Sequence, residues 1–394
     1  MHPDPQPDVF RRMPSPTRPP THDAIRIARV LCILGIVYVH AWTGRTAEQL
    51  EALSDSHQGV LRWGLIELVG RCAVPLLGSI SGWLSGPSAA RRSYGAFVRV
   101  KARTILAPML LWNLVALVLV SGVATVGRLK APIPLGFAEA LDWIGCITQP
   151  NPINVQISFL RDLFLCMLVA PLLARISGRM LAIVALLALI WSMTGLTGPI
   201  LLRPPILLFF TIGMIARRRG WAERIAGWPL WACLLPFLAL LVPKIAFSTL
   251  DERYALAHPA IAAMADLPIR FAAALAIWRI ACGLARAAAG ARIVRLERYA
   301  FLLFCAHLIL IWLGGPLIGA LTGPLGAPAY PPYLLLQPML VLGPTILIGL
   351  GLRRIWPAAA TLLSGGRLRP DRPLPPAAPS AMEPPNSPPP GATS

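Results

Sequence analysis

Two histidines lie inside long apolar runs, and one of them follows an arginine by eleven residues. Arg29 and His40 lie in RIARVLCILGIVYVHAW, and His307 lies in YAFLLFCAHLILIWL. On an α-helix the step from Arg29 to His40 is about three turns, so both side chains share one face, roughly 16 Å apart along the axis. Histidine suits acid/base chemistry because its pKa lies near neutrality, and ionisable residues in apolar runs are costly to keep. For His40, the alternative is a hydrogen bond to a loop near the outer membrane interface, with Arg29 as an ordinary basic residue at the inner end of the span. For His307, the alternative is a core residue whose hydrogen bonds are satisfied within the protein.

Three pairs of charged residues also fall within apolar runs: Glu67 with Arg71, Asp266 with Arg270, and Arg161 with Asp162. The first two pairs are spaced i, i+4, which places opposite charges on one helix face, and we interpret both as compensated structural pairs. The members of the third pair are neighbours in sequence and point in different directions on a helix. We therefore expect each of them to have its own partner on another helix.

A basic segment precedes the apolar run that begins near residue 104. Arg99, Lys101 and Arg103 lie within five residues of each other. Such side chains can bind lipid headgroups or the phosphates of a cytosolic cofactor. Basic residues beside a span are also the ordinary signal for the cytoplasmic side of a membrane.

The elements that position these residues follow from composition. The chain has 394 residues, of which 56% are hydrophobic and 13% charged, and its mean hydropathy of +0.64 excludes a soluble globular enzyme. Runs of about 20 apolar residues are long enough to cross a bilayer. We expect an all-α polytopic transmembrane helix bundle of ten spans, at 25–44, 61–84, 104–126, 157–174, 181–197, 200–216, 226–247, 258–280, 299–320 and 331–352.

The distribution of Lys and Arg predicts the topology. With the N-terminus inside, inner segments hold 26 of these residues and outer segments six, with Lys244 counted among the outer ones. Positive residues concentrate in cytoplasmic loops, so both termini are expected to be cytoplasmic. The same bias explains the net charge of +19 without a nucleic-acid partner. The longest outer loop, 127–156, is the expected place for binding, since long loops are often functional.

The chain is expected to hold one transmembrane domain, 25–355, between polar ends. Residues 1–24 and 365–394 are Pro-rich, with too little apolar surface to fold, and we expect both to be disordered. Residues 356–394 then comprise a short interfacial segment and this tail, and a chain stopped after Gly366 should function normally. The seven cysteines lie singly, so neither a disulfide framework nor a metal site is expected.

Five motifs together resemble the acyltransferase-3 family of integral-membrane acyltransferases. They are Arg29 with His40; AVPLLGSISGWL with Arg71, Pro75, Ser81 and Gly82; KARTILAPMLLW; FLRDL; and FCAHLIL. They follow the family's order over residues 25–352, and the family's ten-span layout agrees with the expected spans.

The resemblance implies a membrane-bound O-acyltransferase that moves an acyl group, most simply acetyl, from acyl-CoA to a sugar hydroxyl of an exopolysaccharide, a lipopolysaccharide or a lipid-linked glycan. Such an enzyme sits in the cell inner membrane among membrane lipids. The implied roles are His40 as general base or transient acyl carrier, Arg29 as the group that orients the thioester or stabilises developing charge, Arg99, Lys101 and Arg103 as holders of the donor's phosphates, and Arg71, Arg161, Asp162 and His307 as substrate-binding residues.

A protein of another class remains an alternative. A transporter or exporter of a lipid-linked glycan or a small anionic solute would also place charged residues within its spans, along a translocation path.

Overall fold

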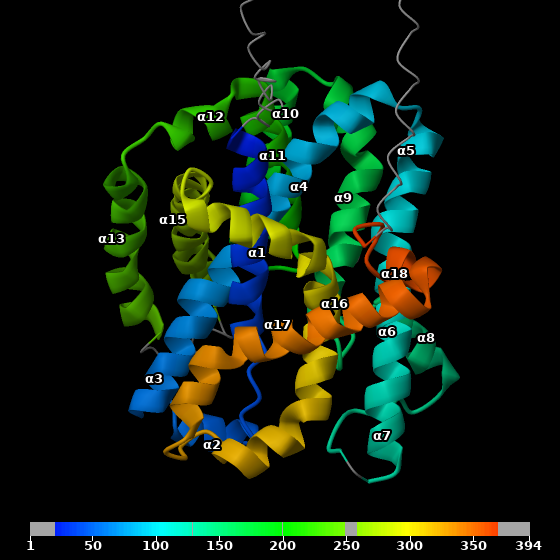
Figure 1. Cartoon of the computed structure of the whole chain (residues 1–394). Helices are drawn as coiled ribbons and strands as arrows, with labels where there is room; N and C mark the ends of the chain where they lie inside the picture. Colours follow the sequence, from blue (N-terminus) through cyan, green and yellow to red (C-terminus); the bar gives the residue numbers. More distant parts are fainter. Residues whose placement is uncertain (1–19, 128, 199, 249–257, 369–394) are drawn as a thin grey trace, which may run out of the picture.

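The computed structural model describes residues 20–127, 129–198, 200–248 and 258–368, and these residues form helices and connections without a strand (Figure 1). The first half comprises α1 (Pro20–Val39), α2 (Ala47–Ala52), α3 (His57–Gly64), the π-helical η1 (Leu65–Arg71), α4 (Cys72–Arg91), α5 (Tyr94–Lys101), the π-helical η2 (Ala102–Leu106), α6 (Ala107–Ala116), the π-helical η3 (Leu117–Ser121), α7 (Gly122–Thr125) and α8 (Phe137–Gly145). The second half comprises the 3₁₀ turn η4 (Val155–Ile157), α9 (Ser158–Arg175), α10 (Gly178–Met193), α11 (Pro204–Arg219), α12 (Trp221–Ala226), α13 (Leu230–Ser248), α15 (Pro259–Leu284), α16 (Ala288–Thr322), α17 (Tyr330–Ile355) and α18 (Pro357–Leu363).

A helix overlaps each of the ten expected spans, so the all-α architecture is confirmed for the described residues. Six helices among these residues are long and apolar enough to cross a membrane: Tyr94–Thr125, Val155–Arg175, Leu230–Phe247, Pro259–Leu284, Ala288–Thr322 and Tyr330–Ile355. The apolar helix α10 is shorter. The count of ten spans and the cytoplasmic position of both termini stay predictions.

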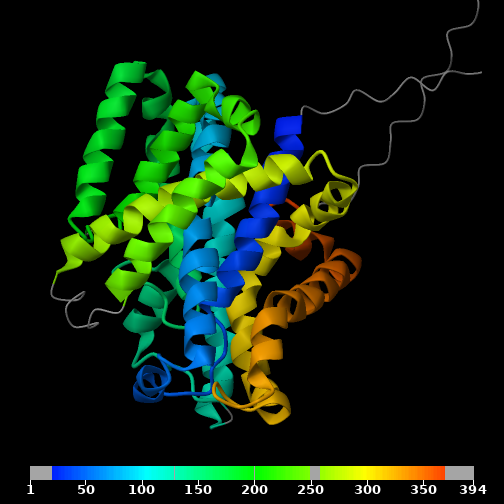
Figure 2. The ribbon, with the colours of Figure 1, turned by 90° about the vertical axis from the view of Figure 1, so that its left-hand side faces the viewer.

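Helix α1 runs through the middle of the bundle. It contacts η1, α4, α15, α16 and α17, and Ile27, Ala28, Cys32 and Val37 on it are fully buried. Figure 1 shows the start of α1 at the same end of the bundle as α5 and α12, with α2 and α7 at the opposite end. The view in Figure 2 shows α16 and α17 inclined beside it. A helix that is apolar on all sides is stable only when it is surrounded, which explains its central position.

Glycines bring α4 and α11 together. A Cβ atom on Gly82 would lie 1.9 Å from the carbonyl oxygen of Phe210, and a Cβ on Gly213 would lie 1.9 Å from that of Ser79. The two backbones therefore touch at both points, as small residues allow between helices in membranes.

Helix α13 lies at the edge of the bundle and packs mainly on α15. Its exposed side chains include Trp231, Leu235, Leu238 and Val242. Such a face is stable against hydrocarbon and costly in water, in agreement with a lipid-facing position.

Residues 129–156, which the sequence predicts to lie in an outer loop, are folded against the bundle. Asn151 and Asn154 are fully buried, and the Asn151 side-chain oxygen accepts the backbone N–H groups of Ile153 at 2.8 Å and Asn154 at 2.9 Å. The indole N–H of Trp312 on α16 donates to the carbonyl oxygen of Ile153 at 3.2 Å. These bonds satisfy buried backbone groups and fix the segment that leads into α9.

Both expected boundaries of the disordered ends were wrong by a few residues. Helix α1 begins at Pro20 rather than after residue 24, and ordered chain continues past residue 365 to Leu368, which is 1% exposed. The backbone N–H of Leu368 donates to the Ser364 hydroxyl at 2.9 Å. A composition averaged over a long Pro-rich segment conceals a few residues that pack. Residues 1–19 and 369–394 lie outside the described residues.

Replacement of Gly82 by alanine should destabilise the bundle by about 1–3 kcal/mol, because the added methyl group would force α4 and α11 apart. Gly86, one turn further along α4, is the matched control, since its Cβ would meet only Met214 Cε at 4.0 Å. Thermal unfolding of the purified variants in one detergent measures the difference. Equal melting temperatures for Gly82→Ala and Gly86→Ala would refute the close contact.

Candidate functional site

The two histidines predicted from sequence meet where α1 ends against α16. The ring centroids of His40 and His307 are 5.4 Å apart, with an angle of 40° between the rings. Helix α1 ends at Val39, so His40 lies one residue beyond it, and its backbone N–H donates to the carbonyl oxygen of Val37 at 3.2 Å. The His307 side chain is fully buried, whereas His40 is half-buried. The site thus pairs one accessible imidazole with one enclosed imidazole.

The contacts of His307 define its tautomer. Its Nδ1 lies 3.0 Å from the carbonyl oxygen of Leu303 and 2.9 Å from that of Phe304. Carbonyl oxygens only accept, so Nδ1 carries the hydrogen and the neutral ring presents an acceptor at Nε2. This Nε2 is buried and has no hydrogen-bond partner among the described residues. An unpaired acceptor therefore stands beside His40.

Buried amides surround the histidine pair, and the sequence interpretation missed them. Gln156 Nε2 donates to the Phe304 carbonyl oxygen at 3.4 Å, which His307 also contacts, and to Asn154 Oδ1 at 2.5 Å. Gln337 Nε2 donates to the Val37 carbonyl oxygen at 3.5 Å. One side-chain atom of each of the three amides is buried without a partner among the described residues. Buried polar atoms are usually paired, so these atoms are available to a polar ligand. Their sequence signal was a polar residue within or beside an apolar run.

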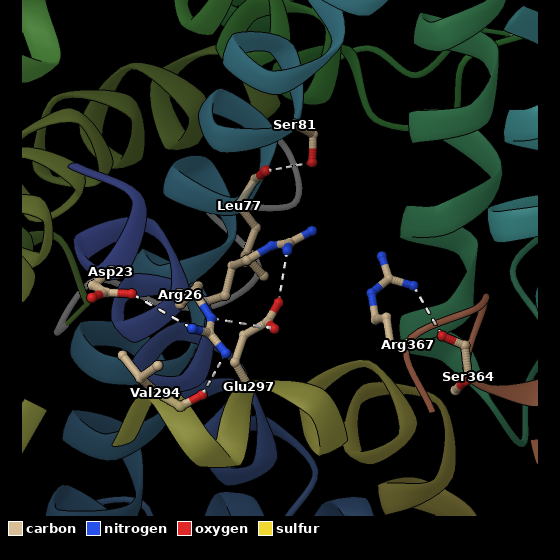
Figure 3. Close-up of polar contacts among 9 residues, drawn as sticks. Asp23, Arg26, Leu77, Ser81, Val294, Glu297, Ser364 and Arg367 are labelled. Carbon is tan, nitrogen blue, oxygen red and sulfur yellow. Dashed lines mark hydrogen bonds and ion pairs between the residues drawn. The ribbon is translucent and has the colours of Figure 1, made fainter. Parts of the chain in front are cut away.

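A second constellation lies between Arg29 and Glu297. Arg29 Nη1 is 2.8 Å from Glu297 Oε1, and Arg26 Nε is 3.8 Å from Glu297 Oε2. Beside them is a cavity of about 70 Å³, lined by residues of α1, α4, η2, α9, α16 and the C-terminal segment, Phe304 and Arg367 among them. Figure 3 shows Arg26 and Glu297 on one side of this region and Arg367 on the other. Glu297 was missed from sequence, although it is the one acid in the basic segment 286–298.

Arg367 enters this cavity from the C-terminal segment. Its guanidinium carbon lies 4.0 Å above the centroid of the Phe301 ring, and Nη1 donates to the Ser364 carbonyl oxygen at 3.1 Å. Burial, with a smaller contribution from the charge of Arg29, lowers the pKa of Arg367 to about 10. The group therefore stays protonated at neutral pH, and the cavity keeps its positive charge.

The basic segment before the third expected span divides into two faces. Lys101 is half-buried, with Nζ 5.3 Å from the centroid of the Phe97 ring, and it interacts electrostatically with Arg29 and Arg367. Arg99 and Arg103 are exposed. Of the three basic residues, only Lys101 is half-buried, and its charge acts on Arg29 and Arg367, which line the cavity.

The two i, i+4 pairs expected from sequence are confirmed and belong to one network. Its ion pairs are Arg71–Glu67 at 2.6 Å, Lys244–Glu67 at 3.2 Å, Lys244–Asp266 at 2.8 Å, and Arg270–Asp266. Lys244 was counted with the outer segments, and that side stays a prediction. It lies in α13, where it joins the two pairs because both carboxylates face it.

The expectation for Arg161 and Asp162 was confirmed in part: each has a partner in another segment, with Arg161 Nη2 donating to the Ile147 carbonyl oxygen at 3.2 Å, but the two residues also pair with each other. Arg161 Nη1 binds Asp162 Oδ1 at 2.7 Å, since a long side chain can bend back to its neighbour. Asp162 Oδ1 also accepts the backbone N–H of Leu202 at 3.3 Å, and Oδ2 accepts that of Arg203 at 3.0 Å. This carboxylate therefore fixes the chain just before α11, where backbone N–H groups lack partners within the helix.

A larger cavity of about 260 Å³ adjoins the ion-pair network. Ser192, Thr197, Arg203, Asp266 and Arg270 contribute its polar lining. It shares one lining residue, Phe159, with the smaller cavity. Arg203 of this cavity and Arg71 of the ion-pair network interact electrostatically with His40.

An acyltransferase domain together with six apolar helices among the described residues defines an acyltransferase of the membrane. The chain belongs to the acyltransferase-3 family, because the profile of this acyltransferase domain matches residues 22–352. It is similar to the succinoglycan biosynthesis protein ExoH of Rhizobium meliloti (strain 1021), with 27% identity over 358 residues that cover 87% of this chain and 92% of that protein. No solved structure matches the chain. Among the described residues, no cluster of His, Cys, Asp or Glu has the make-up of a metal site.

Replacement of Glu297 by glutamine should lower the stability of the protein by about 1–3 kcal/mol, because Arg29 and Arg26 would share no carboxylate. Glu297→Asp should retain part of the stability. Glu223→Gln, in the exposed part of α12, is the control. Thermal unfolding of the three variants is the measurement, and a melting temperature of Glu297→Gln equal to that of the control would contradict the assignment.

Proposed function

We propose that the protein transfers an acyl group, acetyl in the simplest case, from acyl-CoA to a sugar hydroxyl of an exopolysaccharide, a lipopolysaccharide or a lipid-linked glycan at the cell inner membrane. The proposal depends mainly on one observation: the histidine pair and the small, positively charged cavity beside Glu297 both lie along α16. Family membership supplies the reaction class, and similarity to a succinoglycan biosynthesis protein supports a polysaccharide acceptor.

In this reaction His40 acts as general base or as transient acyl carrier. As a base it takes the proton of the acceptor hydroxyl while the sugar oxygen bonds to the thioester carbonyl carbon. The carbon–sulfur bond then breaks, and the proton passes from His40 to the departing thiolate, which leaves as free CoA. The unpaired Nε2 of His307 suits stabilising the imidazolium that His40 forms.

The donor would enter from the cationic cavity. Glu297, at the cavity, and His307 are ten residues apart on α16, which corresponds to roughly 15 Å. The pantetheine arm of CoA has the length of about four extended residues, roughly 14 Å. A phosphate held near Arg29 and Lys101 would therefore place the thioester at the histidine pair. In this arrangement Arg29 would bind the donor's phosphate, roughly 15 Å from the reacting carbonyl. It would therefore not orient the thioester or stabilise charge there, which is the role that the resemblance implies.

The acceptor would occupy the larger cavity. Its carboxylate, guanidinium and hydroxyl groups suit the many hydrogen bonds of a sugar, and Arg71 would border the entrance near His40. Arg161 and Asp162 would act indirectly, through the position of Arg203 and the start of α11.

Incubation of the purified protein with acetyl-CoA that is labelled in the acetyl group tests the function. Transfer of label to an added glycan with release of a thiol is the expected result. A transporter would give neither, and their absence with every acyl-CoA and glycan supplied would refute the proposal.

His40→Ala should lower the transfer rate by at least about a hundredfold, because general acid–base groups contribute that much. His57→Ala is the matched control, since His57 is exposed on α3. The readout is the acetyl content of the glycan at equal protein levels in the membrane. Full activity of the His40 variant would exclude it as base and as carrier.

Lys101→Gln should raise the KM for acyl-CoA more than Arg99→Gln or Arg103→Gln does, because Lys101 alone is half-buried and interacts electrostatically with Arg29 and Arg367 of the cavity. Lost phosphate contacts weaken ground state and transition state alike, so kcat should change little. Arg295→Gln, exposed on α16, is the control. Equal increases for all three variants of the basic segment would contradict this division, and a change only in the acceptor's KM would remove the segment from the donor site.

A further inference from the structure

The small cavity carries more positive charge than its single carboxylate can balance. Glu297 binds both Arg29 and Arg26. Lys101 and Arg367 have no carboxylate within ion-pair distance among the described residues, although both interact electrostatically with Arg29. Cations held together away from water repel one another unless an anion joins them. The arrangement is therefore incomplete without a negatively charged ligand.

The C-terminal segment, residues 357–368, is built to deliver Arg367 to this cavity. The indole N–H of Trp112 on α6 donates to the carbonyl oxygen of Leu363 at 3.0 Å, which anchors the end of α18. Gly365 and Gly366 follow with φ of +59° and +85°, a conformation that glycine adopts readily. A Cβ on Gly365 would lie 2.3 Å from the Thr104 carbonyl oxygen, so the turn packs directly on η2. Burial of Leu368 then fixes the residue that follows Arg367.

We propose that Arg367 is a phosphate-binding residue, which together with Arg29 and Lys101 holds a phosphate group of the acyl-CoA donor. The inference rests on the proposed function for its ligand, and extends the donor site to a segment outside the ten expected spans. A volume of about 70 Å³ admits a group of a few heavy atoms and excludes a nucleotide or a hexose. Guanidinium groups present several N–H donors to phosphate oxygens, and charge-assisted bonds of this kind are strong.

The position of the cavity suits a donor that is bound by its phosphate and reacts at its thioester end. Phe304 lines the cavity, and its backbone carbonyl oxygen contacts His307 Nδ1. A phosphate at Arg367 is thus separated from the histidine pair by the side chains of one helix face. An anionic phospholipid headgroup offers the same phosphate chemistry, so the test has to separate the two sources.

The experiment measures the binding of acetyl-CoA and of acetyl-pantetheine, which lacks the phosphates, to the purified full-length protein in nanodiscs. One set of discs contains phosphatidylcholine alone, and the other also contains phosphatidylglycerol. The variants are Arg367→Gln, Arg367→Lys, and chains stopped after Gly366 and after Leu368. Arg354→Gln, exposed in the last turn of α17, is the control. Thermal unfolding confirms that each variant is folded.

Arg367→Gln and the stop after Gly366 should each weaken acetyl-CoA binding about tenfold in phosphatidylcholine discs, the loss expected for one charge-assisted bond. Arg367→Lys should recover part of it, and the stop after Leu368 and the control should bind normally. Acetyl-pantetheine affinity should not change. The placement of Arg367 thus reverses the expectation that a chain stopped after Gly366 functions normally.

Unchanged or tighter acetyl-CoA binding in folded Arg367→Gln would overturn the assignment to the donor, and so would an equal loss for acetyl-pantetheine, which would indicate a structural role. If Arg367→Gln removed only the thermal stabilisation that phosphatidylglycerol gives to the protein, the phosphate at Arg367 would belong to a lipid headgroup instead. If the intact protein binds no acyl-CoA, the proposed function fails, whereas normal donor binding without any contribution from Arg367 refutes this inference alone.

Discussion

The contact between Arg29 and Glu297 sets the register of the two helices on which the site depends. Helices α1 and α16 run in the same direction, and this ion pair joins them at one level while His40 and His307 meet about ten residues further along both. Because each helix rises by a fixed amount per residue, the first contact determines the second. A slip of one turn along either helix would separate the histidines and break the ion pair between Glu297 and Arg29 inside the bundle.

The bundle treats its buried charges in two different ways. In the network around Lys244, three cations alternate with two carboxylates, and the residual charge is shared along a chain of contacts that joins η1, α13 and α15. Around Glu297, four cations gather near two carboxylates, because Asp23 also pairs with Arg26 at 3.5 Å. Alternating charges stabilise helix packing, whereas a local excess of one sign stores repulsion that a ligand can relieve. The first arrangement joins helices and also supplies Asp266 and Arg270 to the larger cavity, whereas the second has the character of a binding site for an anion.

Sequence patterns predicted what depends on short spacing. The apolar runs indicated the helices, and the i, i+4 rule identified the pairs of Glu67 and Asp266, because both depend on neighbours along one helix. The amides around His307, the link through Lys244 and the insertion of Arg367 depend on contacts between distant segments, for which one sequence has no signal. Asp162 shows the same limit: helix geometry gave the directions of neighbouring residues, but not the backbone N–H groups before α11 that the carboxylate accepts.

Phe159 belongs to the linings of both cavities, and its ring meets that of Phe304 edge-on at 5.9 Å between centroids. At this point, one aromatic side chain separates the two internal volumes. A smaller side chain at position 159 would open a path between the larger cavity and the small cavity, and a larger one would narrow both. The size of this one residue therefore limits how freely water and solutes pass from one internal volume to the other.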